Sequence, residues 1–211
     1  MRQALACCAL ILACWPAWAQ QIPDGHRFAL TPFIAYRAGG DIDDRDSSDR
    51  LSLDDSSALG LVLGIPWTPA SELEFYYGRQ STGFDTSGLV SDVTALELDF
   101  DTLQIGGTYF LDADGPTRSF IVATAGGTRI KPSAPGARSD TFFSFGIGGG
   151  WHLFANTPIG VRVEARALGT LIDSSTDFLC GVNNGSGGCI FNTTGDILWQ
   201  FEAQAGLIFR F

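Results

Sequence analysis

The last segment of the chain, ILWQFEAQAGLIFRF (residues 197–211), alternates between two kinds of side chain. A period of two is the signature of a β-strand, because successive side chains on a strand point to opposite faces. The segment therefore predicts a strand with one apolar face and one mostly polar face. The apolar face holds Ile197, Trp199, Phe201, Ala203, Ala205, Leu207, Phe209 and Phe211, and the other holds Leu198, Gln200, Glu202, Gln204, Gly206, Ile208 and Arg210.

The same alternation recurs upstream, and Gly, Pro, Asp and Asn separate one alternating segment from the next. Amphipathic helical periodicity is missing, and no segment approaches the run of about 18 apolar residues that a transmembrane helix needs. The phase of the alternation is ambiguous in Ser119–Ile130 and slips near Phe100–Leu103. Seven further strands are predicted at Phe28–Arg37, Ser57–Trp67, Glu72–Gln80, Asp99–Phe110, Ser119–Ile130, Thr141–Leu153 and Ile159–Leu171.

Short and long connections alternate along the predicted strands. Short turns on one end and long loops on the other are typical of transmembrane barrels, so we predict an all-β fold: an eight-stranded antiparallel transmembrane up-and-down β-barrel. Pro32 and Pro66 each remove a ladder donor and fit best near a rim. The short connections are Thr68–Ser71, Leu111–Arg118 and Ala155–Pro158, and the long ones are Ala38–Ser56, Ser81–Leu98, Lys131–Asp140 and Asp173–Asp196.

The first 19 residues, MRQALACCALILACWPAWA, have the layout of a secretory signal peptide. Arg2 precedes an apolar stretch, and Ala17-Trp18-Ala19 forms an A-x-A cleavage site. We expect cleavage after Ala19, which leaves residues 20–211 as the barrel domain. A lipoprotein signal with Cys14 as the lipidated residue is the alternative.

The chain has 211 residues and a formal net charge of −10, from 13 Lys and Arg against 23 Asp and Glu. This balance argues against a nucleic-acid partner, because phosphate binding needs clustered basic residues. A soluble lipocalin-like barrel would show the same alternation, turned inside out. The membrane barrel is favoured because the predicted polar faces carry few charges and because aromatic residues gather toward the strand ends, as in interfacial girdles: Trp67, Phe75, Tyr77, Tyr109, Trp151, Trp199, Phe209 and Phe211.

The signal peptide, the eight strands and the terminal AGLIFRF (205–211) resemble the small outer-membrane β-barrel superfamily of the OmpA/OmpX type. The resemblance covers the whole mature chain and implies an integral protein of the bacterial outer membrane, in contact with the lipid bilayer and lipopolysaccharide, and monomeric. It also implies that the barrel-assembly machinery reads Leu207, Phe209 and Phe211 as the insertion signal. The two-part members of the superfamily have a periplasmic domain after the barrel, and we expect this chain to depart from them in having none.

Eight strands enclose an interior that side chains just fill, so the inward polar groups must satisfy one another. Three Arg and three Glu balance in the predicted set, and we expect charge pairs that cross between strands. Such a network serves either as a structural plug, the favoured interpretation, or as a gate in a narrow pore. The predicted lumen residues are Glu74, Gln104, Arg162, Glu164, Arg166, Gln200, Glu202, Gln204 and Arg210.

Cys180 and Cys189 are the two cysteines of the mature chain, and they lie in a Gly-rich segment of an exported protein. We expect them to form a disulfide that staples a loop. No His accompanies them, so a metal site is not predicted.

The first long loop is acidic, with Asp41, Asp43, Asp44, Asp46 and Asp49, followed by Asp54 and Asp55. A solvated loop is favoured over a Ca²⁺ site, because the segment lacks the Gly and the distal Glu of an EF-hand loop.

The mature chain holds two histidines, His26 and His152, and neither has a serine at the spacing that a hydrolase of lipids would need. Nucleophilic catalysis requires a nucleophile and a base within reach of each other. We therefore predict no enzyme activity and no cofactor. The expected function is envelope integrity or adhesion through the outer loops to an unidentified surface ligand. The alternatives are a narrow pore or conduit for small solutes or hydrophobic molecules and, last, a lipid-modifying enzyme.

Overall fold

The computed structural model describes residues 27–43, 50–52, 54–83, 97–112, 115–132, 139–172, 180–183, 186–189 and 197–211. The predicted signal peptide lies outside these residues, and so does His26. Among the described residues no helix is long and apolar enough to cross a membrane.

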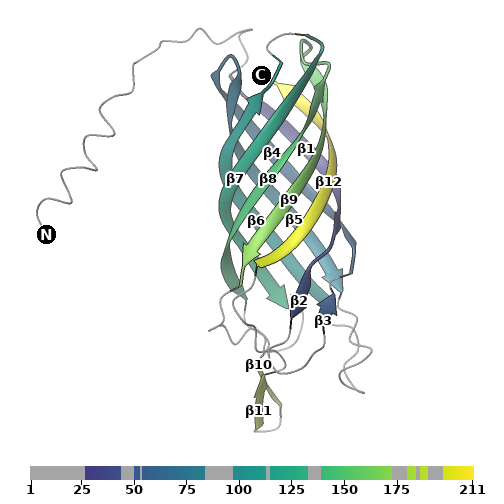
Figure 1. Cartoon of the computed structure of the whole chain (residues 1–211), viewed down its shortest axis with the longest axis vertical. Helices are drawn as coiled ribbons and strands as arrows, with labels where there is room; N and C mark the ends of the chain where they lie inside the picture. The colour runs from purple at the N-terminus through teal and green to yellow at the C-terminus, as the bar shows by residue number, and fades with distance from the viewer. Residues whose placement is uncertain are drawn as a thin grey trace, which may run out of the picture.

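Eight antiparallel strands close into one barrel, which confirms the predicted fold (Figure 1). Each strand pairs with its neighbours in the chain, and the first strand closes the barrel against the last. Closure gives every barrel strand a neighbour on each side and leaves no open sheet edge, which a lipid environment requires because it offers no water to unpaired backbone groups. In barrel order the strands are β1 (Ala29–Ala38), β12 (Ile197–Arg210), β9 (Ile159–Leu171), β8 (Asp140–Leu153), β7 (Thr117–Pro132), β6 (Glu97–Phe110), β5 (Ser71–Gly83) and β4 (Ser56–Thr68).

Two short hairpins accompany the barrel and were not predicted. The first pairs β2 (Asp41–Asp43) with β3 (Arg50–Ser52), and the second pairs β10 (Cys180–Asn183) with β11 (Ser186–Cys189). The first hairpin places Asp41 and Asp43 of the acidic loop on a strand, whereas Asp44, Asp46 and Asp49 lie outside the described residues. Strands this short carry too few residues for a period of two to be read from the sequence.

Short turns join β4 to β5, β6 to β7 and β8 to β9 at one end of the barrel, which we call the turn end. The chain terminus Phe211 lies at this end as well, and the long connections leave from the opposite, loop end (Figure 1). The exposed Asp112 accepts hydrogen bonds from the hydroxyl of Ser119 and from its backbone N–H (3.1 Å), which lower the pKa of that carboxyl. The turn end is therefore fixed by hydrogen bonds from strand to turn.

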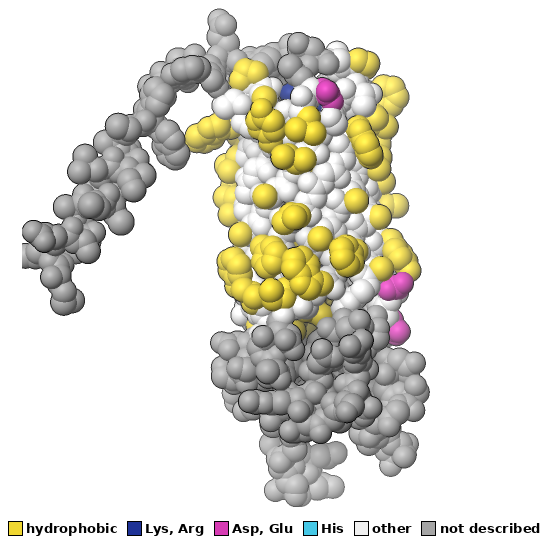
Figure 2. All heavy atoms as spheres, in the orientation of Figure 1, with side chains coloured by type: hydrophobic (Ala, Val, Ile, Leu, Met, Phe, Trp, Pro, Cys, Tyr) yellow, Lys and Arg dark blue, Asp and Glu magenta, His cyan; other side chains and the backbone are white. Residues whose placement is uncertain are grey.

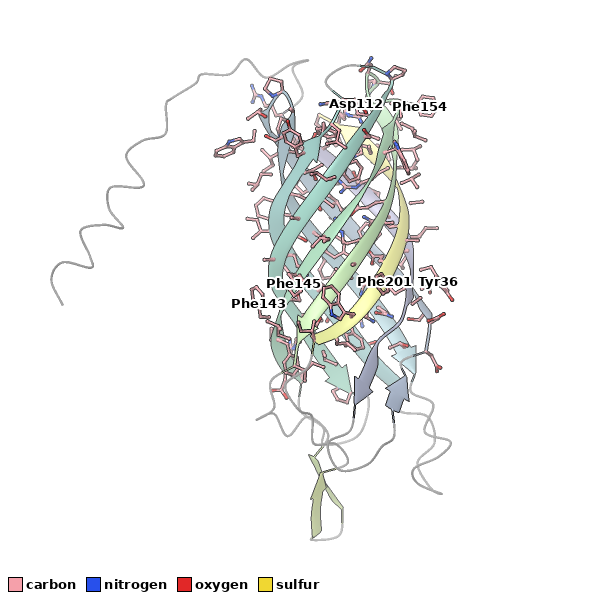
Figure 3. All side chains as sticks on the ribbon, viewed as in Figure 1. Tyr36, Asp112, Phe143, Phe145, Phe154 and Phe201 are labelled. Carbon is pink, nitrogen blue, oxygen red and sulfur yellow. The ribbon has the colours of Figure 1, made fainter. Side chains whose placement is uncertain are left out.

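The outer wall of the barrel is apolar and the inner wall is largely polar. Trp67 is 68% exposed and Trp151 is 55% exposed, whereas the inward Arg166 is 2% exposed. Large apolar side chains gather in a band near each end of the barrel (Figure 2). Tyr36, Phe143, Phe145 and Phe201 mark the band near the loop end (Figure 3). This arrangement is that of a barrel embedded in lipid, and it excludes the inside-out, lipocalin-like alternative.

The structure resolves the two segments whose phase the sequence left open. In β6, Phe100 and Thr102 face inward and Leu103 faces outward. In β7, Phe120 and Val122 face inward. Alternation continues without a break through both strands. The sequence hides it because apolar residues also face the interior, near the loop end in β6 and near the turn end in β7.

Pro32 interrupts the seam between β1 and β12. The register pairs Leu30 with Phe209 and Phe33 with Gly206, and Thr31 and Pro32 between them have no partner on β12. Proline has no N–H to donate to the ladder. The other predicted rim proline, Pro66, sits at a shift of register between β4 and β5, next to the turn.

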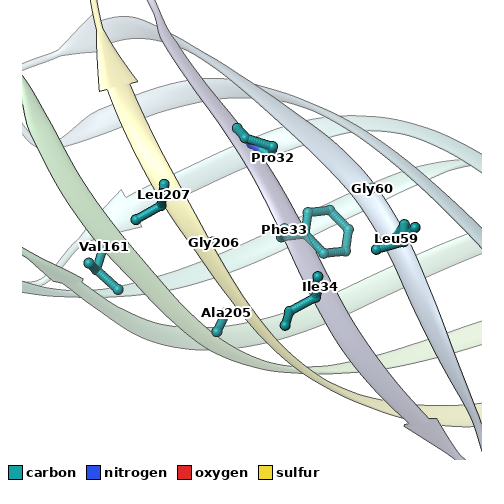
Figure 4. Close-up of a pocket in the computed structure, with 9 residues that line it drawn as sticks. All are labelled: Pro32, Phe33, Ile34, Leu59, Gly60, Val161, Ala205, Gly206 and Leu207. Atoms are coloured by element: carbon teal, nitrogen blue, oxygen red, sulfur yellow. The ribbon is translucent and has the colours of Figure 1, made fainter.

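An apolar groove of about 600 Å³ lies over this seam on the outer wall (Figure 4). The groove is hollow because some of its lining residues are small: Gly60, Ala205 and Gly206 line it together with Pro32. The ring of Phe33 fills the space beneath: a Cβ on Gly60 would lie 2.2 Å from that ring. The groove is thus a depression in the wall that Phe33 separates from the interior.

The β10–β11 register bears on the predicted disulfide. Cys180 lies opposite Cys189 and Asn183 opposite Ser186, with Asn-Gly, the preferred sequence of a two-residue hairpin turn, between the strands. Counting from the turn, hydrogen-bonded and non-hydrogen-bonded pairs alternate, so the cysteines occupy a non-hydrogen-bonded position. The Cα atoms of such pairs are about 4.5 Å apart, within the range that a disulfide spans.

We expect both cysteine thiols to resist alkylation until a reductant is added. Reduction should destabilise the hairpin by about 2–3 kcal/mol in the chain-entropy model, and leave barrel unfolding unchanged, because β10 and β11 form a separate sheet. Mass spectrometry after alkylation, with and without reductant, measures the first effect. A C180S/C189S variant serves as control, and labelling of the unreduced protein would contradict the pairing.

Candidate functional site

The centre of the barrel holds four charges in one cluster, the ionic core, formed by Glu74, Arg162, Glu164 and Arg166. The carboxylate of Glu74 accepts from Arg162 at 2.8 Å and from Arg166 at 2.6 Å. Glu164 accepts from the same two arginines, at 2.7 Å each. All four side chains are at most 3% exposed. Because each charge has two opposite partners, the cluster is neutral and its geometry is determined by four bridges.

Neutral polar groups complete the hydrogen bonding of the ionic core. Thr108 donates to Glu74 at 2.6 Å and Gln204 donates to Glu164 at 2.5 Å. Thr124 donates to Gln104 at 2.7 Å, and Gln104 donates to Ser144 at 3.0 Å. These bonds involve six of the eight barrel strands, β5, β6, β7, β8, β9 and β12. The Oε1 atom of Gln204 has no hydrogen-bond partner among the described residues. The other groups named here are paired, as expected because a buried polar group without a partner is destabilising.

A second ionic cluster lies toward the loop end. Arg37 donates to Glu202 at 2.6 Å and to the hydroxyl of Tyr76 at 2.8 Å, and this hydroxyl donates to Glu202 at 2.9 Å. Gln80 accepts from Arg37 at 3.2 Å and from Gln200 at 3.1 Å. The guanidinium of Arg166 lies 4.3 Å from the centre of the Tyr76 ring and so links the two clusters.

The structure places eight of the nine predicted lumen residues inside the barrel, each at most 4% exposed. Arg210 is the exception, and the prediction for it was wrong. Its guanidinium donates to the backbone carbonyls of Phe154 (3.3 Å) and Thr157 (2.7 Å) in the β8–β9 turn. The third arginine of the interior is instead Arg37, so three arginines still face three glutamates.

Apolar side chains close the interior above and below the two ionic clusters. At the turn end the rings of Phe110 and Phe120 lie 5.1 Å and 4.9 Å from the ring of His152, and Ile208 is fully buried. At the loop end the buried apolar side chains are Leu98, Phe100, Ile130, Phe142, Leu168, Ile172 and Leu198. The two ionic clusters therefore lie between two groups of buried apolar side chains.

His152 faces the lumen at the turn end, in an aromatic setting. Its Nε2 atom has no hydrogen-bond partner among the described residues. Ser144 is engaged with Gln104 instead. Within the described part of the chain, no group of three or more His, Cys, Asp or Glu side chains is placed to hold a metal ion.

The predicted insertion signal lies on the outer wall at the turn end. Leu207 is 50% exposed and Phe211 is 58% exposed. The Phe211 ring stacks on Phe28 with 5.0 Å between centroids, and their backbones pair through Phe211 N–H and the Phe28 carbonyl at 3.0 Å. The last residue is thus held at the closing seam, and its role in assembly stays a prediction.

No protein-family model matches the chain, and no curated protein sequence matches it. Solved structures do. Neisserial surface protein A is 13% identical over 87% of this chain and 97% of its own, with a TM-score of 0.55. The outer membrane protein OprG from Pseudomonas aeruginosa is 10% identical over 89% and 98%, with a TM-score of 0.52.

The attachment invasion locus protein Ail of Yersinia pestis, solved in complex with the heparin analogue sucrose octasulfate, is 11% identical over 88% of this chain and 99% of its own. Its TM-score is 0.50. At these identities the similarity concerns the fold. Together with the closed register and the apolar outer wall, it shows that the chain folds as an integral β-barrel of the small outer-membrane type.

Proposed function

We propose that the protein resides in the bacterial outer membrane as a non-enzymatic barrel, with a role in envelope integrity or in surface interaction through its outer loops. The filled interior is the observation that carries this proposal. Two neutral ionic clusters between apolar layers favour a structural plug, because a conducting lumen needs continuous polar surface and water. A plugged barrel is a rigid support for the segments that leave its loop end.

The sequence of the outer segments narrows the class of partner. Residues 41–55 carry seven Asp against two Arg, and residues 173–196 carry three Asp and no basic residue. Complementary charge steers association and disfavours like-charged partners. We therefore expect a partner with a basic surface, in contrast to the sulfated heparin analogue that Ail binds in its crystal structure.

The test compares cells that display the native chain with cells that display one of two variants. In the first variant a short Gly-Ser linker replaces residues 174–194. In the second variant Asn replaces Asp41, Asp43, Asp44, Asp46 and Asp49. We expect retention on a panel of immobilised matrix proteins to fall in the variants, most on basic proteins, while the barrel still migrates faster on gels when unboiled. Resistance to bile salts reads out envelope integrity. Variants that equal the native chain in both assays would contradict the proposal.

The pore alternative predicts discrete conductance steps in planar bilayers, whereas a filled barrel predicts none. We expect the purified barrel to give no discrete conductance steps, because charged and apolar side chains fill its interior. A porin of known conductance, inserted in the same bilayer, serves as the positive control. Regular steps that change size when Arg166 is replaced would show that the ionic core lines an open path.

A further inference from the structure

On three adjacent strands the outer wall changes from apolar to charged just beyond the loop-end aromatic band. On β5 the exposed Tyr77 is followed on the same face by Arg79, and on β6 the exposed Leu103 is preceded by Asp101. The register aligns these residues across β5, β6 and β7 in two rows. We call the two rows the rim patch: Arg79, Asp101 and Arg129 in one row, and Ser81, Asp99 and Lys131 in the other.

Two aspartates hold two of the cations of the rim patch in place. Asp99 lies 3.1 Å from Arg79 and accepts from Ser81 at 2.5 Å. Asp101 accepts from the ammonium group of Lys131 and lies 3.9 Å from Arg79. Arg79 remains 55% exposed and Lys131 36% exposed, so both cations stay accessible from outside the barrel.

Arg129 has no carboxylate partner among the described residues. Its guanidinium donates to the hydroxyl of Ser139, at 2.7 Å and 3.3 Å, and the side chain is exposed. After internal pairing the rim patch therefore retains one positive charge and a set of unused N–H donors. The rim patch is thus positive, although the chain as a whole has a formal net charge of −10.

The rim patch is local. On the other five barrel strands, no basic side chain of the described residues faces outward near the loop end, and the outward positions there hold Tyr36, Leu59, Phe143, Leu171 and Trp199. Charges on the outer wall of a barrel are tolerated at the membrane interface and not at the midplane. The patch therefore lies at headgroup level, at the end of the barrel from which the acidic outer segments leave.

We propose that the rim patch binds the phosphorylated headgroup of an outer-leaflet lipid, an inference that rests on the proposed residence in the outer membrane. A phosphate monoester carries up to two negative charges and three acceptor oxygens, which match the free donors of Arg79, Arg129 and Lys131. A lipid reaches the patch laterally within the leaflet. A soluble anion would approach from the loop end, where the negative charge of the outer segments disfavours it.

The experiment measures binding of bisphosphorylated lipid A to the mature barrel in neutral detergent by native mass spectrometry. Each basic residue near a charged lipid surface contributes about 1 kcal/mol, so we expect affinity to fall about fivefold for Arg129→Gln and about 30-fold for R129Q/K131Q. Arg27→Gln removes an exposed positive charge at the turn end and is the matched control, with unchanged affinity. Arg129→Lys should retain binding.

Three results would overturn the proposal: equal affinity for R129Q/K131Q and the native chain, undiminished binding of lipid A without phosphates, or competition by inorganic phosphate at equimolar concentration. The last result would assign the patch to a free anion. Faster migration of the unboiled variants establishes that they are folded, and Arg129→Gln removes only the contact with Ser139. The cell-retention assay depends on the loops and the lipid assay depends on the rim patch. Failure of the lipid assay therefore leaves the proposed role of the loops standing, and failure of the retention assay leaves the lipid site standing.

Discussion

Replacing Arg166 by Met is expected to lower the free energy of unfolding by about 3–5 kcal/mol, the usual effect of removing one partner from a buried ion pair. Arg166 is fully buried and bridges Glu74 (2.6 Å) and Glu164 (2.7 Å). The methionine preserves most of the side-chain volume but leaves two carboxylates to share Arg162. Urea unfolding in lipid vesicles, followed by tryptophan fluorescence, measures the change.

Arg79→Met is the matched control, because Arg79 also faces two carboxylates. Asp99 is 3.1 Å and Asp101 3.9 Å away, but the arginine is 55% exposed. Exposed pairs contribute about 0–1 kcal/mol, so this variant should unfold almost as the native protein does. Adding Glu74→Gln and Glu164→Gln to Arg166→Met should recover part of the loss. Equal effects of the two arginine variants would show that the ionic core does not stabilise the barrel.

Gly106→Ala should destabilise the barrel about as much as Arg166→Met does. The cause here is contact of the added Cβ with backbone atoms, and no charge is lost. A Cβ at Gly106 would lie 2.0 Å from the carbonyl oxygen of Ala123 and 2.6 Å from the Cα of Thr124 on β7. Overpacking typically costs about 1–3 kcal/mol, and we expect the upper end of this range because the obstructing atoms are backbone. The measurements are the yield of the fast-migrating unboiled form and the midpoint of urea unfolding.

The neighbouring Gly107 provides the control. It faces outward, and a Cβ there would approach no atom more closely than the Glu72 carbonyl oxygen, at 3.5 Å. Gly107→Ala should change stability by no more than about 0.5 kcal/mol. If both alanine variants fold and unfold alike, β6 and β7 are not as tightly opposed as the register indicates.

Period-two alternation was sufficient to predict the fold class, the strand count of the barrel and most of its interior. It works because one face meets lipid and the other meets polar side chains, so neighbouring residues differ in kind. Gln200, Glu202 and Gln204 illustrate this, since each is polar between apolar neighbours and each lies inside.

The alternation failed where the two faces look alike. Tyr76 lies between Phe75 and Tyr77, so three aromatic residues hide which one faces inward. Arg37 lies one residue before the end of β1, whose inward face otherwise reads Ala29, Thr31, Phe33 and Ala35 and so resembles a lipid face. For Arg210 the alternation suggested an interior position that the side chain does not occupy. Arg210 is on the inward side of β12, but it is the last residue of the strand, and its guanidinium therefore reaches carbonyls of the β8–β9 turn.

The long sequence separation of the interior charges has a consequence for the lifetime of the folded state. Glu74 and Arg166 are 92 residues apart in the chain, and Arg37 and Glu202 are 165 apart. Glu74 and Arg166 cannot pair before the strands from β5 to β9 have assembled, and Arg37 and Glu202 cannot pair before β1 has met β12. Interactions that form after the rate-limiting step slow unfolding without accelerating folding. The ionic clusters therefore lengthen the time for which a closed barrel stays closed, and they have little effect on how fast it folds.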